Sequence, residues 1–165
     1  MWSIWIFKYD IMFSMSEQTI SIKYEKISND LQLLYEKHKI IIGGQTMYVS
    51  KTATNLKDGI KNMMEGAKAD YVRWSTSGGK ELTGYSLEQT QKWDSNTKVT
   101  EGKKYIKVVQ ENGVFCFVMK EDSGRFKKGD ILKAAGWAKP ALNAPRGNVL
   151  TGDYQIRWTG PLYLK

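Results

Sequence analysis

The residues best suited to chemistry lie in the C-terminal third of this 165-residue chain, where basic and aromatic side chains occur together. Lysine and arginine neutralise phosphates and release counterions, and flat aromatic rings stack on unpaired bases. The segment 123–165 holds eight basic residues against two acidic ones, and the formal net charge of the whole chain is +8. We therefore predict that this segment binds nucleic acid, either DNA or RNA. The expected contact residues are Lys127, Lys128, Lys133, Trp137, Lys139, Arg146, Arg157 and Trp158.

The same composition has a second interpretation, in which the lysines form a solvated surface and the tryptophans lie in the core. The chain would then be a structural or interaction protein that makes protein contacts through its aromatic surface. The loop around Asn143 and Arg146 favours the first interpretation, because exposed amides there can hold phosphate oxygens. No named nucleic-acid motif occurs in the chain.

The chain has one histidine and one cysteine, which restricts catalysis and metal binding. His38 lies on the apolar stripe of a predicted helix, and Cys116 lies within an apolar run, so we expect both to be packing residues. One cysteine excludes an internal disulfide and a Cys/His zinc cluster, which fits a reducing intracellular compartment. The sequence also has no P-loop or dinucleotide fingerprint. We predict a non-enzyme without catalytic residues, metal or cofactor.

A metal-dependent nuclease is the weaker alternative. Its carboxylates would come from Glu121, Asp122 and Asp130, which stand near Lys127 and Lys128. Adjacent acids followed by a Ser-Gly pair are more typical of a solvated turn. The late region also has few carboxylates for two-metal hydrolysis, so we expect these acids to shape a turn.

The pattern of apolar residues predicts an α+β fold, with two short helices in the N-terminal half and an antiparallel sheet or small barrel in the C-terminal half. The helices are expected at 28–38 and from Thr54 to Ala67, with Gly66 near the end of the second. The clearest hairpin is 104–120, because Asn112-Gly113 favours a type I′ turn. Further strands are expected at 19–26, on both sides of Gly43-Gly44 within 39–50, and at 71–74, 131–134, 154–158 and 162–164, with a loop at 137–147.

Three regions are expected along the chain: an apolar extension at 1–15, an α+β subdomain at 16–100 and a basic β-rich subdomain at 101–165, or one continuous domain in place of the last two. Lys8 and Asp10 interrupt the first block, so we expect neither a membrane span nor a secretory signal there. The block is expected to be a strand of the core, an extension upstream of a start at Met15, or a partner-binding segment.

Two short segments are similar in sequence: Val72-Arg73-Trp74-Ser75 and Ile156-Arg157-Trp158-Thr159. Alternation along a strand would put each arginine and its neighbouring tryptophan on opposite faces of a sheet. We expect a core tryptophan and an exposed arginine at each site.

Three C-terminal segments resemble a C-terminal module of uncharacterised small proteins of large double-stranded DNA viruses. They are FKKGDILKAAGW (126–137), KPALNAPRGNV (139–149) and WTGPLYL (158–164). The resemblance covers roughly residues 103–165 and brings no catalytic residues. It implies a viral origin and a virion-packaged or genome-associated product in the infected host, with other virion proteins as further partners.

Overall fold

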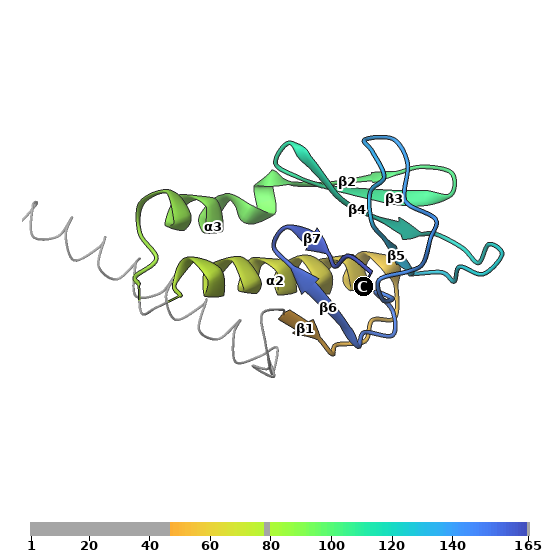
Figure 1. Ribbon diagram of the computed structural model, residues 1–165, viewed down its shortest axis with the longest axis horizontal. Helices are drawn as coiled ribbons and strands as arrows, with labels where there is room; N and C mark the ends of the chain where they lie inside the picture. Colours follow the sequence, from red (N-terminus) through yellow and green to blue (C-terminus); the bar gives the residue numbers. More distant parts are fainter. Residues whose placement is uncertain (1–46, 78–79, 165) are drawn as a thin grey trace, which may run out of the picture. The chain divides into compact units, whose positions relative to one another are not determined.

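The computed structural model describes residues 47–77 and 80–164, which form an α+β fold with two helices and two antiparallel sheets (Figure 1). This confirms the predicted fold class. Helix α2 (Leu56–Ser75) and helix α3 (Gly84–Asn96) run in opposite directions beside each other. The strands are β1 (Met47–Val49), β2 (Thr97–Glu101), β3 (Tyr105–Gln110), β4 (Gly113–Met119), β5 (Ile131–Leu132), β6 (Tyr154–Arg157) and β7 (Gly160–Pro161).

Helix α2 is the predicted second helix, but it is longer than expected. The side chain of Asn55 accepts a hydrogen bond from the amide of Asp58 at 2.9 Å, and this caps the N-terminus. The helix continues through Tyr71, whose buried ring keeps to the same face as Met63 and Ala67. The prediction of a strand at 71–74 is therefore wrong. Aromatic and β-branched residues favour strands only weakly, and burial against the helix core decides here.

Two glycines within α2 are explained by close packing. A Cβ on Gly66 would lie 2.7 Å from Cγ2 of Val49, and one on Gly59 would lie 2.6 Å from the carbonyl oxygen of Val149. Glycine destabilises a helix interior relative to alanine, but here it lets a strand and a loop approach the helix backbone. The prediction that Gly66 marks the end of the helix is wrong for this reason.

Helix α3 was not predicted from the sequence. Only Thr90 and Trp93 of its thirteen residues are buried, so it has almost no apolar stripe. Its exposed side carries an ion pair between Lys92 and Glu88, one turn apart, and the Lys92 ammonium lowers the pKa of Glu88. That i,i+4 pair among good helix formers was the available signal in the sequence.

The larger sheet has the strand order β2-β3-β4-β5. Its centre is the predicted hairpin, in which Gln110 pairs with Gly113 across a turn formed by Glu111 and Asn112. The hairpin is confirmed, but the turn is displaced by one residue: Glu111 has the positive φ, at 51°, and Gly113 already belongs to β4. A type I′ turn on Asn112-Gly113 is therefore not formed.

The smaller sheet has the order β1-β6-β7 and joins distant parts of the chain. Residues 47–49 pair antiparallel with 154–156, and this sheet packs on α2. The strand predicted at 154–158 is confirmed as β6. The last strand is Gly160–Pro161 rather than 162–164, because the backbone turns directly after Trp158 to pair with Arg157 and Ile156.

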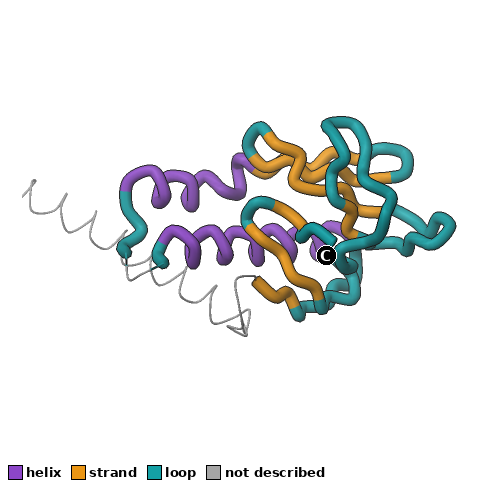
Figure 2. The backbone as a smooth tube through the Cα atoms, in the orientation of Figure 1, coloured by secondary structure: helices purple, strands orange, loops and turns teal. Residues whose placement is uncertain are grey.

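Long loops connect β4 to β5 and β5 to β6 (Figure 2). The predicted turn at Gly129-Asp130 is confirmed, and Gly129 has a φ of +89° there. The loop predicted at 137–147 is also confirmed. The expected strand at 19–26, the helix at 28–38, the Gly43-Gly44 turn, His38 and the block 1–15 lie outside the described residues.

The larger sheet is covered on both faces, and β4 therefore has five consecutive buried residues. Cys116 and Val118 belong to the main core with α2 and the smaller sheet, whereas Phe117 and Met119 pack in a second cluster with Phe126 and Leu132. The expectation that Cys116 is a core residue is confirmed.

The thiol of Cys116 should be inert in the folded protein. Burial raises its pKa far above the usual range, and the thiolate is the reactive form. Because the chain has only this cysteine, we expect an aromatic disulfide reagent to react at pH 8 only as denaturant unfolds the protein. Rapid stoichiometric reaction of the native protein, at the rate of the urea-unfolded chain, would contradict the buried placement.

Candidate functional site

Six of the eight predicted contact residues lie between β4 and β6, in a segment that we call the basic loop region and define as residues 120–147. The segment wraps around the short strand β5. Its two limbs are joined by backbone hydrogen bonds, from Ala141 to Lys133 and from Arg146 to Ile131. The six residues are Lys127, Lys128, Lys133, Trp137, Lys139 and Arg146.

Within 123–147, three basic side chains donate to backbone carbonyl oxygens. Lys133 donates to the carbonyl of Pro161 at 3.0 Å, and Arg146 donates through Nε to the carbonyl of Leu162 at 2.9 Å. Arg125 donates to the carbonyl of Leu142 on the opposite limb. A carbonyl orders the cation without neutralising it, so these three side chains keep their full positive charge.

Aromatic rings contact Lys133, one of these cations, and also Lys107 of β3. The ammonium of Lys133 lies 3.9 Å from the centre of the Tyr163 ring, and that of Lys107 lies 4.8 Å from the centre of the Trp137 ring. Such contacts are attractive because the ring face is negative. Trp137 remains 59% exposed and Tyr163 80% exposed, so both rings keep surface for a partner.

Two of the three carboxylates of the region, Asp122 and Asp130, are bound by groups of the loop, and the third, Glu121, is exposed. Asp122 accepts hydrogen bonds from the amide of Lys128 and from the ammonium of Lys127, and these contacts lower its pKa. Asp130 is buried and accepts from the amide of Lys127 and from Asn148. Both acids therefore shape the turn. Within 47–77 and 80–164, no group of three or more Cys, His, Asp or Glu residues could hold a metal ion.

Lys127 is the one basic residue of 123–164 that forms an ion pair with a carboxylate among the described residues. Lys128, Lys139 and Arg157 are exposed, and their side chains have no partner in the described part of the chain. These three cations are available to an incoming anion without breaking any contact.

Arg157 is the last residue of β6 and Trp158 lies in the turn between β6 and β7, so both are outside the loop region. The expectation of a core tryptophan beside an exposed arginine fits this pair in part, since Trp158 is half-buried and Arg157 exposed. The expectation is wrong for the similar segment 72–75, where Trp74 is 58% exposed and Arg73 forms an ion pair with the buried Asp70. The tryptophans of the two segments, Trp74 and Trp158, are in contact, with their ring centres 5.1 Å apart.

Trp74 and Trp158 form one wall of a cavity of about 610 Å³, which we call the aromatic pocket. It lies between the C-terminal half of α2, helix α3, the turn of the β3–β4 hairpin and the β6–β7 turn. Its aromatic lining residues are Tyr71, Trp74, Tyr85, Trp93, Phe115 and Trp158.

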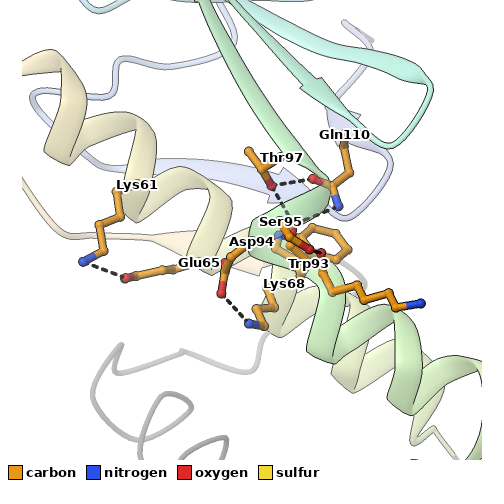
Figure 3. A network of polar contacts seen from close by, with 9 residues as sticks. Lys61, Glu65, Lys68, Trp93, Asp94, Ser95, Thr97 and Gln110 are labelled. Carbon is orange, nitrogen blue, oxygen red and sulfur yellow. Dashed lines mark hydrogen bonds and ion pairs between the residues drawn. The ribbon is translucent and has the colours of Figure 1, made fainter.

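Polar contacts fix the elements that surround the pocket (Figure 3). Lys68 of α2 forms an ion pair with Asp94 of α3 at 3.0 Å. At the end of α3, the hydroxyl of Thr97 donates to Gln110 at 2.6 Å, and the amide of Gln110 donates to the carbonyl of Trp93. Gln110 thereby ties the hairpin to helix α3 beside the pocket.

The sequence analysis did not include Lys107 and Arg125 among the expected contact residues, and it did not predict the aromatic pocket. The two similar arginine–tryptophan segments were the available signal for the pocket, because each supplies a tryptophan to its wall. The sequence analysis assigned both segments to strands. Lys107 stands on β3, outside the segment where the charge was counted, and only the fold brings it to Trp137.

No helix of the described residues is both long and apolar enough to cross a membrane. Comparison of the sequence with protein-family models and with curated proteins, and of the structure with solved structures, gives no match.

Proposed function

We propose that this protein binds DNA or RNA through the basic loop region and acts as a non-enzymatic, genome-associated or virion-packaged protein. The resemblance of residues 103–165 to small proteins of large double-stranded DNA viruses suggests this setting, inside an infected host cell. The proposal concerns phosphate contacts and ring stacking, without readout of a particular base sequence.

One observation supports the proposal most strongly. Arg125, Lys133 and Arg146 are ordered by carbonyl oxygens, and Lys128 and Lys139 have no partner among the described residues. These five cations form no ion pair among the described residues, whereas Lys120 and Lys127 of the same region pair with Glu101 and Asp122. A phosphate backbone supplies the missing anions, and the exposed ring of Trp137 offers a stacking surface for an unpaired base.

The experiment is a titration of a fluorescent single-stranded oligonucleotide at several salt concentrations. The double variant Lys128→Ala/Lys139→Ala removes two exposed cations of the region. Each lost phosphate contact should lower the slope of log affinity against log salt by about 0.7, so the double variant should lower it by about 1.4. Fluorescence anisotropy measures both the affinity and the slope.

The matched control is Lys51→Ala/Lys57→Ala, which removes the same charge from exposed positions near the start of α2. We expect the control to bind almost as the unaltered protein does. Equal losses in the two double variants would mean that only net charge matters, and absence of binding at low salt would refute the proposal altogether.

The exposed apolar side chains of Leu142, Tyr163 and Leu164 favour a second candidate, a surface for contacts with other virion proteins. This candidate predicts weak dependence on salt and no effect of the lysine substitutions. The titration therefore separates the two functions.

A further inference from the structure

The aromatic pocket has the properties of a preformed ligand-binding site. Its volume of about 610 Å³ lies within the range of small-molecule pockets, and six of its fourteen lining residues are aromatic. Neighbouring rings brace one another: Tyr71 lies 5.7 Å from Trp93 and 5.5 Å from Trp158 between ring centres. The wall is therefore rigid before any ligand arrives.

The charge of the lining restricts the ligand. Within residues 47–77 and 80–164, no lysine or arginine lines the pocket, although the chain as a whole is strongly basic. Glu111 is the one carboxylate in the lining, and the other polar groups are hydroxyls and amides such as those of Ser86 and Gln89. A phosphate would find no cation here, whereas a neutral ring with polar edges would find both stacking faces and hydrogen-bond partners.

One polar group of the lining lacks a partner. Trp93 is buried, and its indole N–H has no acceptor among the described residues. This nitrogen has almost no accessible surface, so it is an unpaired donor inside the wall and not a contact point for a ligand.

We infer that the aromatic pocket binds a neutral, flat heteroaromatic ring of the nucleobase type, stacked on Trp74 and Tyr85. These two rings are 58% and 69% exposed and present the open faces of the pocket.

This site is separate from the basic loop region. Strand β4 begins at the pocket with Gly113 and reaches the loop region after seven residues, a distance of about 20 Å at ~3.3 Å per residue. The inference therefore does not rest on the proposed function. The ring has two possible sources, a free nucleoside or an unpaired base of a strand.

The test is isothermal titration calorimetry of the full chain with adenosine, with AMP and with a short single-stranded oligoadenylate. The variant is Trp74→Ala. Its matched control is Trp137→Ala, which removes an equally exposed tryptophan from the basic loop region. Thermal unfolding of both variants verifies that they fold, and Tyr85→Ala replaces Trp74→Ala if that variant does not fold.

We expect Trp74→Ala to weaken adenosine binding about tenfold or more, since base stacking contributes about 1–3 kcal/mol. Trp137→Ala should leave adenosine binding unchanged, and AMP should bind no more tightly than adenosine. Stronger Trp74-dependent binding of the oligoadenylate than of adenosine would identify a strand as the source. Weaker binding would identify the free nucleoside.

Absence of adenosine and oligoadenylate binding at millimolar concentration would overturn the inference, as would equal losses of adenosine binding in the two variants. Loss of oligoadenylate binding in Trp137→Ala alone would support the proposed function and reject the pocket. The two claims therefore fail separately.

Discussion

Replacement of Asp70 by alanine should lower the free energy of unfolding by about 3 kcal/mol or more. This carboxylate is only 3% exposed, accepts from Arg73 at 2.5 Å and also accepts from the backbone amide of Trp158 at 2.9 Å. Removal leaves a partly buried amide without its acceptor and a guanidinium without its carboxylate, and both effects are costly. Urea denaturation measures the change.

Asp70→Asn is the control, because its side-chain oxygen can still accept from the amide of Trp158. We expect Asp70→Asn to be clearly more stable than Asp70→Ala. If the two variants were equally stable, or if alanine cost less than about 1 kcal/mol, Asp70 would not connect α2 to the β6–β7 turn as the structure indicates.

Replacement of Gly147 by alanine should destabilise the protein by about 2–4 kcal/mol. Its φ of +129° is a conformation that residues with a side chain rarely adopt, and a Cβ there would lie 2.2 Å from Cβ of Tyr154. Tyr154 is buried in the main core and cannot move aside easily. Backbone strain and overpacking contribute about 1–3 kcal/mol each.

Gly136→Ala is the matched control from the same loop region. Nothing lies within 4 Å of a Cβ built on Gly136, and its φ is not positive. Thermal unfolding of the two variants should give a large decrease in Tm for Gly147→Ala and almost none for Gly136→Ala. Similar midpoints would show that the loop does not pack on β6 as described.

Strong local patterns in the sequence predicted the elements that depend on local chemistry. The hairpin at 104–120 was predictable because alternating β-branched and aromatic residues flank a turn. The first three turns of α2, up to Ala67, were predictable from the spacing of Leu56, Ile60 and Met63. The loop at 137–147 followed from its two prolines.

The remaining elements depend on tertiary contacts that no local pattern encodes. Helix α3 buries only Thr90 and Trp93, so its sequence resembles a polar loop. Residues 71–74 are helical because Tyr71 packs into the aromatic cluster, although their composition favours a strand.

For the two candidate sites too, one part is visible in the sequence and another part depends on the fold. The excess of basic residues in 123–165 is visible in the sequence, but whether each charge is neutralised depends on contacts such as that of Arg146 with the carbonyl of Leu162. The aromatic pocket joins Trp74 to Trp158, which are more than eighty residues apart, and only the fold brings them together.

The proposed nucleic-acid binding is tested most directly by mapping the contact surface in solution. The measurement is a nuclear magnetic resonance titration of the full, isotope-labelled chain with a single-stranded oligonucleotide. We predict salt-sensitive shifts in the amides of Lys128 and Lys139 and in the indole of Trp137, while the amides around Lys51 and Lys57 on the start of α2 stay unchanged. Shifts confined to residues outside 120–147, or no shifts at low salt, would contradict the proposal.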